Sequence, residues 1–419
     1  MRKIACDIRS RRLTGIYRYG TTLLEHLDKL LLDTDIKLYL LYRPDTQEQA
    51  VQDLSRRLPQ EHVELIAVYN DYGRIPRSPW ILDWVVREGI ELYYSIDFVV
   101  DKELPIPFIY TVHDIFLHKY PKYSFDTNEE FQAKFGMDEF KLMERDLETV
   151  KAYIPGNLSS HEVPTITKYI WAMSRYLGEK SKHIIASTES SKEEIVHYLT
   201  VPESKMTVIL AAADASCFYP RPDEEAIPVV QKYGLSKNYC LGVGLDLKRK
   251  RLEWLLENLA RCRADLPQNA KVAIAGKYDN LDQRLKKVAS LGLNELVVFP
   301  GRVNDDELAC LYSKAKALIV PSLDEGFCLP AVEALMCGTE VIVPDTKVLR
   351  EVAGACGHFY EVEDGNKLGQ LITQALNGSL PPKARYFENR FSWDASARQF
   401  LELLTSMLEG ERADAASAY

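Results

Sequence analysis

Short apolar runs alternate with amphipathic stretches along the whole chain. The apolar runs of the first half have the length and the β-branched and aromatic content of buried strands. Several of the stretches between them, such as SSKEEIVHYLT, have polar and apolar residues at helical spacing. Strands that alternate with helices predict a parallel, doubly wound sheet. The strands predicted in the first half are 37–42, 91–96, 108–112, 183–187 and 207–210.

The alternation breaks at residues 216–237, where three prolines and an acidic cluster predict a linker. It then restarts, with strands predicted at 239–244, 271–276, 295–301, 317–322 and 339–345. We therefore predict an α/β protein with two Rossmann-like, doubly wound domains, at residues 1–216 and 217–391. A helical element is expected as an insertion at about 126–165. Residues 392–419 are expected to form a C-terminal helix that packs back on the first domain.

Composition and charge narrow the classes of function. A formal net charge of −9 argues against general nucleic-acid binding, which requires a basic surface. No run approaches the roughly 20 apolar residues of a membrane-spanning helix, so we expect at most peripheral membrane contact. The eight cysteines include no CxxC pair, which favours reduced thiols and a cytoplasmic protein. We expect no metal site and no cofactor.

In the stretch SLDEGFCLPAVEALMCGTEVIVPD, residues 322–345, Glu325 and Glu333 lie eight positions apart. Pro330 suits the first position of a helix and Gly338 the position after its end. The loop before this helix then lies at the carboxyl end of a strand, where open α/β sheets bind ligands and where helix amides favour an anion. Glu325 and Glu333 could hold two parts of one nucleotide sugar. Alternatively, both could be acidic residues that simply stabilise a helix N-terminus.

The longer stretch GRVNDDELACLYSKAKALIVPSLDEGFCLPAVEALMCGTEVIVPD resembles the donor-binding segment of family 4 glycosyltransferases. The likeness includes E-G-F-x-L-P-x-x-E, the G-x-V turn before it and the C-G-x-x-V-I-V strand after it. It implies the GT-B fold, in which two Rossmann-like domains face a central cleft, and a retaining transfer from a nucleotide-diphosphate sugar. Cys328 is a departure, because the family usually has glycine or another small residue there.

The resemblance assigns donor contacts in the second domain. Lys250 aligns with the family's diphosphate-binding lysine and Arg249 with its basic neighbour, although Arg251 stays open in a register shifted by one residue. A leaving diphosphate needs such fixed positive charge. The run LKRKR could also be a solvated charge run. Leu245 stands where the family often has arginine. Glu333 is expected on the ribose hydroxyls and Glu325 on the sugar. The remaining donor contacts are expected from Gly244, Arg302, Val303, Gly326, Phe327, Cys328 and Leu329.

In the first half, TVHDIFLHKYPKYS resembles the family's V-H-D segment, whose histidine lies beside the donor sugar. His113 is therefore expected to contact the sugar, although a lone histidine is more often structural. Asp114 could equally cap a turn. Gly15 lies in a counterpart of the family's N-terminal glycine loop, where the backbone could approach the diphosphate. Four nearby arginines could hold a phosphorylated or lipid-diphosphate acceptor, or be ordinary surface charge: Arg9, Arg11, Arg12 and Arg18.

Together these features predict a retaining, metal-independent hexosyltransferase. Its donor would be a nucleotide-diphosphate sugar, with UDP-glucose as the first candidate, and its acceptor a glycan or a lipid-linked glycan of polysaccharide biosynthesis. Two other enzyme classes remain open, a nucleotide-sugar epimerase and a sugar phosphorylase of the same fold. A non-catalytic nucleotide-sugar-binding protein is a third alternative.

Overall fold

A computed structural model describes residues 1–9, 15–69, 79–98, 100–121, 127–160, 163–278 and 280–417. These residues form two compact units. The first unit is Met1–Ala211 together with the C-terminal segment that begins at Ser392, and the second is Ala212–Phe391. Sequence analysis placed the corresponding boundaries at 216/217 and 391/392. Within the described residues, no helix is both long enough and apolar enough to cross a membrane.

The first domain contains, within the described residues, a parallel sheet in the order β3-β2-β1-β4-β5-β6-β7. The chain runs outward from β1 to β3, then returns to the other side of β1, so the order reverses between β1 and β4. The strands are β1 (Arg2–Asp7), β2 (Ile36–Tyr42), β3 (Val63–Ala67), β4 (Leu92–Ser95), β5 (Phe108–Val112), β6 (His183–Ala186) and β7 (Met206–Val208).

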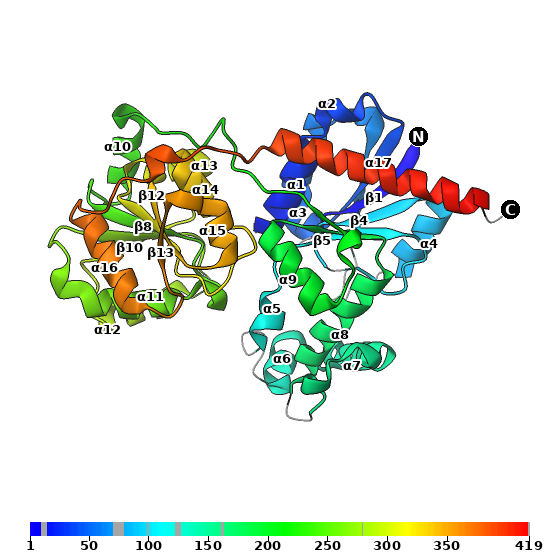
Figure 1. Cartoon of the computed structure of the whole chain (residues 1–419), viewed down its shortest axis with the longest axis horizontal. Helices are drawn as coiled ribbons and strands as arrows, with labels where there is room; N and C mark the ends of the chain where they lie inside the picture. Colours follow the sequence, from blue (N-terminus) through cyan, green and yellow to red (C-terminus); the bar gives the residue numbers. More distant parts are fainter. Residues whose placement is uncertain are drawn as a thin grey trace. The chain divides into compact units, whose positions relative to one another are not determined.

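Helices connect the strands of the first sheet, as the alternating pattern predicted (Figure 1). They are α1 (Gly15–Glu25), α2 (Asp28–Leu31), α3 (Pro44–Arg57), α4 (Pro79–Glu88), α5 (Phe116–Lys119), α6 (Asn128–Phe135), α7 (Met137–Val150), α8 (Thr165–Lys180) and α9 (Glu189–Leu199). The element expected at 126–165 is α6 and α7, which lie between β5 and β6 and pack on α8. Phe131 and Met143 bury their side chains completely in this packing.

The C-terminal helix α17 (Trp393–Ser417) belongs to the first domain and packs along α1 (Figure 1). The ring of Trp393 meets the ring of Tyr19 edge-on, with 5.6 Å between centroids. At the other end, the Arg2 and Lys182 side chains donate hydrogen bonds to the carbonyls of Leu408 and Met407, at 2.9 and 2.8 Å. These contacts attach the last helix to the first sheet.

The second domain repeats the plan with the order β10-β9-β8-β11-β12-β13, again all parallel in the described chain. Here the order reverses between β8 and β11. The strands are β8 (Tyr239–Val243), β9 (Lys271–Ala275), β10 (Val297–Gly301), β11 (Ala317–Ile319), β12 (Glu340–Pro344) and β13 (Gly357–Tyr360). The helices are α10 (Asp223–Lys232), α11 (Leu252–Cys262), α12 (Leu281–Ser290), α13 (Asp305–Lys314), α14 (Leu329–Met336), α15 (Lys347–Ala353) and α16 (Gly365–Leu376). The predicted pair of doubly wound domains is confirmed.

The prediction of a linker over 216–237 is wrong in one respect, because this segment contains α10, which packs on α13. Its acidic cluster, Asp223 to Glu225, forms the first turn of the helix, where negative side chains are favourable. Pro222 precedes that turn at the N-cap. Pro222 and the acidic cluster, which suggested a linker, thus start a helix, and Pro228 lies inside it.

Candidate active site

The candidate site in the second domain lies where its strand order reverses. β8 and β11 are neighbours in the sheet, with Leu241 opposite Leu318, although they are far apart in sequence. The loops that follow them come together at the sheet's carboxyl edge, the usual ligand-binding position of this fold. The β8 loop carries Arg249 and Lys250 in a short 3₁₀ helix before α11. The β11 loop carries Glu325 before α14.

The three side chains form one ion-paired cluster. Arg249 Nη1 lies 2.8 Å from Glu325 Oε2, and Lys250 Nζ donates to Glu325 Oε1. Ser322 Oγ adds a hydrogen bond of 2.6 Å to the same Oε1. The two loops are also joined by their backbones, because the Leu323 amide donates to the Arg249 carbonyl at 2.9 Å. Sequence analysis predicted both cations and Glu325 as site residues but did not predict that they contact one another.

Glu325 is charged in this cluster. Burial acts most strongly on its pKa and raises it. The attraction of Lys250 and Arg249, with hydrogen bonds from Lys250 and Ser322, outweighs burial and lowers the pKa to about 2. The side chain is only 3% exposed, whereas those of Arg249 and Lys250 are 21% and 12% exposed. The cations are thus held by a buried carboxylate and remain partly open to solvent.

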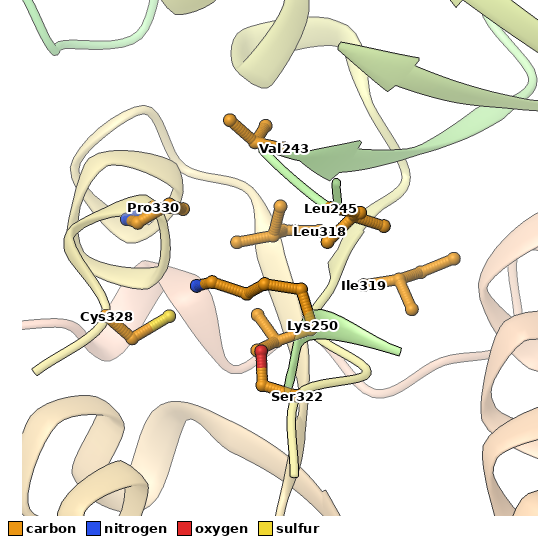
Figure 2. A pocket seen from close by; sticks show the side chains of 9 residues that line it. Val243, Leu245, Lys250, Leu318, Ile319, Ser322, Cys328 and Pro330 are labelled. Atoms are coloured by element: carbon orange, nitrogen blue, oxygen red, sulfur yellow. The ribbon is translucent and has the colours of Figure 1, made fainter. Parts of the chain in front are cut away.

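Lys250 crosses a small pocket beside this cluster. Figure 2 shows its side chain extended toward Cys328 and Pro330, with the aliphatic side chains around Leu245 and Leu318 on the other side. The ammonium group therefore reaches the start of α14. The pocket is lined by Val243, Leu245, Lys250, Leu318, Ile319, Val320, Ser322, Cys328 and Pro330.

The alternative register is disfavoured by the contacts of Arg251. Its guanidinium group stacks on the Trp254 ring at 3.9 Å and donates to the Val362 carbonyl and to Glu363, at 2.8 and 2.7 Å. These partners lie in α11 and in the segment before α16. Lys250, and not Arg251, is the residue that lines the pocket.

The loop before α14 is buried throughout, from Val320 to Cys328. Phe327 meets Phe391 edge-on at 5.2 Å between ring centroids, and Leu329 opens the helix. Cys328 has a left-handed backbone, with φ 78° and ψ 66°. Only glycine adopts this conformation without steric cost, which accounts for the glycine expected here from the family pattern and makes Cys328 a strained departure from it. Burial raises the pKa of the Cys328 thiol to about 12, so it is neutral at physiological pH.

We expect Cys328→Val to lower the free energy of unfolding by about 2 kcal/mol, because a β-branched residue fits the left-handed region poorly. Cys328→Gly is the matched control. It removes the steric cost but adds unfolded-state entropy, so its stability should stay within about 1 kcal/mol of wild type. Urea unfolding measures both. Equal stability of the two variants would contradict the conformational explanation.

Glu333 lies one turn into α14 and is buried, with 2% exposure. Its Oε2 accepts a hydrogen bond of 3.1 Å from the Tyr312 hydroxyl of α13. Glu333 does not line the Lys250 pocket. The structure therefore brings Glu325 to the two cations and places Glu333 against a buried tyrosine. Neither carboxylate merely decorates the exposed start of a helix.

The other predicted donor residues follow neighbouring strands. Gly244 follows β8 with φ 65°, a conformation that favours glycine, and its amide donates to the Ala275 carbonyl at 2.8 Å. Gly326 lies in the buried loop after Glu325. Arg302, which is exposed, and Val303 follow β10, two strands away from β8 in the sheet.

In the first domain, His113 directly follows β5. Its Nε2 lies 2.7 Å from the Ile96 carbonyl, so this nitrogen carries the proton and Nδ1 is left as an acceptor. Burial lowers the pKa of His113, against the opposing effects of Ile96 and Asp114, and the imidazole is neutral at pH 7. The ring meets Tyr19 edge-on at 5.0 Å. Asp114 accepts a hydrogen bond from the Phe116 amide at 3.1 Å and caps the turn into α5.

The predicted acceptor residues are described only in part, because Arg11 and Arg12 lie outside the described residues. Arg9 is not ordinary surface charge: its guanidinium group makes a two-pronged contact with buried Asp7, at 2.8 and 2.6 Å. Arg18 is half-buried on α1. Gly15 begins α1 and is exposed, and a methyl group added to it would meet nothing within 4 Å.

Three partners of the site were not predicted: Ser322, Tyr312 and Asp7. Each supports a predicted residue, by hydrogen bonding to Glu325, to Glu333 and to Arg9 respectively. Ser322 could have been found from its position directly after a strand and three residues before Glu325. Tyr312 offered no such signal, because it looks like any apolar position of α13. Among the described residues, no group of three or more His, Cys, Asp or Glu side chains is arranged to hold a metal ion.

Comparison with known proteins finds one matching family model. Residues 223–398 match the family model described as glycosyl transferases group 1. The match lies almost entirely in the second domain and covers less than half of the chain, so it is this domain that is similar to glycosyl transferases group 1. The family resemblance found in residues 301–345 is thereby confirmed, and so is the GT-B fold.

Two curated proteins similar to this chain come from Escherichia coli. The serotype-specific mannosyltransferase WbdA is 28% identical over 243 residues, which are 56% of this chain and 30% of WbdA. The O-antigen chain mannosyltransferase B is 25% identical over 378 residues, 87% of each chain. Among solved structures, Anabaena Alr3699/HepE in complex with UDP-glucose shares the fold, with a TM-score of 0.67 and 17% identity over 96% of this chain and 99% of HepE.

Proposed function

We propose that this protein is a retaining, metal-independent hexosyltransferase of polysaccharide biosynthesis, which uses a nucleotide-diphosphate sugar and a glycan or lipid-linked acceptor. The observation that carries the proposal is the cluster of Arg249, Lys250 and Glu325 at the reversal point of the second sheet. Two cations beside the amides of a helix start suit a diphosphate that gains negative charge as it leaves.

In the proposed complex, Lys250 and Arg249 neutralise the departing diphosphate. Glu325 holds the two cations in place and orients the hydroxyl groups of the sugar, and Glu333 binds the ribose. Arg302 and Val303 meet the base through their backbone. His113, neutral and with Nδ1 open as an acceptor, contacts the transferred sugar.

The proposed reaction needs no covalent intermediate on the protein. The bond between the sugar's anomeric carbon and the diphosphate oxygen breaks first, and the diphosphate leaves with the electron pair. The acceptor hydroxyl oxygen then bonds to the anomeric carbon on the same face. Its proton passes to an oxygen of the leaving diphosphate. The cations stabilise the charge on that diphosphate in the transition state.

For the hexose, we propose mannose as the first sugar to test, because both relatives described above are mannosyltransferases. UDP-glucose, the donor suggested by the sequence, is the competing candidate. A panel of UDP, GDP, UDP-glucose and GDP-mannose separates them by thermal stabilisation. A ligand at 100 times its Kd should stabilise the folded chain by about 2.7 kcal/mol. Failure of every member to stabilise the protein would refute the proposal.

Product analysis with and without an acceptor glycan separates transfer from the alternatives. An epimerase would change the donor alone, and a phosphorylase would require inorganic phosphate. A non-catalytic binding protein would take up the donor without slow hydrolysis and without transfer. Formation of a new glycosidic bond that depends on the acceptor is the result we expect.

Glu333→Gln tests the ribose assignment. Glutamine keeps an acceptor for the Tyr312 hydroxyl, so the fold should persist, while the charge that favours two ribose hydroxyls is lost. We expect nucleoside diphosphate affinity to fall about tenfold, the effect of roughly one charged hydrogen bond, with a smaller change in turnover. Calorimetry measures the affinity. Tyr312→Phe is the structural control, and an equal loss there would assign the effect to packing.

A further inference from the structure

A second pocket lies entirely within the first domain, at the carboxyl end of β5. Its walls come from β5, α5, α8 and α9, and it encloses about 390 Å³ including its opening to solvent. Phe98, which is 39% exposed, contributes an aromatic ring to the lining. The lining residues are Phe98, Tyr110, Val112, Asp114, Ile115, Leu117, His118, Ile170, Ser174 and Leu199.

The walls are mainly apolar but include two buried polar atoms without a protein partner. Among the described residues, neither the Tyr110 hydroxyl nor His118 Nε2 makes a hydrogen bond. Tyr110 is 1% exposed and His118 is 9% exposed. An unsatisfied buried polar atom costs about 1–3 kcal/mol, so a group that supplies hydrogen bonds here would bind favourably.

The charges around the pocket favour an uncharged occupant. Among the lining residues that the structure describes there is no lysine or arginine, and Asp114 is acidic, so an anion would be repelled. Burial, together with nearby Arg175 and against Asp114, lowers the pKa of His118 to about 4. The imidazole is therefore neutral at physiological pH. A cation would have to lose its hydration among aliphatic side chains.

The pocket lies at the same end of β5 as His113, because Val112 and Asp114, which line it, flank His113 in the chain. We infer that it is a specificity pocket for the acceptor, which takes an uncharged, mainly apolar group with one hydroxyl or ether oxygen attached to the acceptor sugar. The oxygen would pair with the Tyr110 hydroxyl or His118 Nε2, and the aliphatic part would fill the rest. This inference rests on the proposed glycosyltransferase function.

The first experiment measures the binding of small probes to the pocket, with no nucleotide-sugar donor present and no transfer reaction. Three probes of equal chain length, 1-hexanol, hexanoate and hexylammonium, are titrated into the full chain and followed by saturation-transfer NMR. We expect 1-hexanol to bind at least tenfold more tightly than either charged probe. Equal affinity for the three, or no binding of 1-hexanol, would overturn the inference.

Two variants and one control, Ser174→Ala, test where 1-hexanol binds. Ser174→Leu places an aliphatic side chain in the pocket on a helix that tolerates leucine, and should weaken 1-hexanol at least tenfold. Ser174→Ala leaves the space open and should stay within twofold of wild type. Tyr110→Phe removes an unpartnered hydroxyl, so the fold should persist while 1-hexanol binds about fivefold more weakly. Unchanged binding in Ser174→Leu would assign the probe to another site and refute the inference.

Transfer kinetics then test whether the pocket binds part of the acceptor. Hexyl and methyl α-mannosides are compared as acceptors, and the hexyl compound should have a KM about tenfold lower in wild type. The ratio of the KM values of the methyl and hexyl compounds should approach one in Ser174→Leu. A ratio of one in wild type, with 1-hexanol binding intact, would overturn the acceptor role alone. Absence of transfer to any acceptor, with binding intact, would instead refute the proposed function.

Discussion

Replacing Lys250 with alanine should lower kcat about a hundredfold or more. The ammonium group is one of two cations placed to neutralise a departing diphosphate, and removal of one such contact commonly costs about 3 kcal/mol of transition-state stabilisation. Because the interaction strengthens as charge develops on the leaving group, we expect a larger effect on kcat than on KM. Steady-state kinetics with a nucleotide-sugar donor measures both constants.

Lys248→Ala is the matched control, since it removes the same charge from the same short 3₁₀ helix but from an exposed position. Its kcat should stay within about twofold of wild type, because an exposed charge is screened by solvent. Circular dichroism confirms that both variants are folded. Similar turnover in Lys250→Ala and Lys248→Ala would remove Lys250 from the proposed mechanism.

Glu325→Gln should destabilise the protein at neutral pH and change how stability depends on acid. The pKa of Glu325 falls from 4.5 in an unfolded chain to about 2 in the folded one. The unfolded state therefore takes up this proton at higher pH than the folded state, so the stabilisation is present above pH 4.5 and is lost as pH falls toward 2. At about 1.4 kcal/mol per pKa unit it amounts to about 3 kcal/mol at pH 7.

The measurement is urea unfolding of wild type and variant between pH 7 and pH 4. The stability difference should be about 3 kcal/mol at pH 7 and about 1 kcal/mol smaller at pH 4. Glu363→Gln is the control, because Glu363 also pairs with an arginine but is 73% exposed, and exposed pairs contribute about 0–1 kcal/mol. A pH-independent difference for Glu325→Gln would mean that the lost charge is not the cause.

The sequence predicted the two-domain architecture because each strand and helix has its own local pattern. It also placed Lys250, Glu325 and His113 at carboxyl ends of strands, for the same reason. It did not predict that Glu325 pairs with Arg249 and Lys250, because that contact depends on β8 and β11 being neighbours, and strand order is a property of the whole sheet. The acidic run in the first turn of α10, which was interpreted as part of a linker, shows the reverse case, in which one composition fits both a linker and a helix start.

The sequence was also ambiguous about Arg249, Lys250 and Arg251, three cations in a row. What separates them is a left-handed backbone at Arg251, with φ 54°, which turns its side chain toward Trp254 while Lys250 reaches the pocket. The periodic pattern of apolar and polar residues does not reveal a left-handed backbone at one residue. The resemblance to the glycosyltransferase family aligned Lys250 with the diphosphate-binding lysine, which the pattern alone could not do.

The first domain is built from two separate stretches of chain, whereas the second is one continuous stretch between them. On the ribosome, the first sheet is therefore made early but must wait for α17, which emerges only after the whole second domain. Until then the apolar face that receives Trp393 and Phe400 stays uncovered, and it is a place where a chaperone could bind the nascent protein.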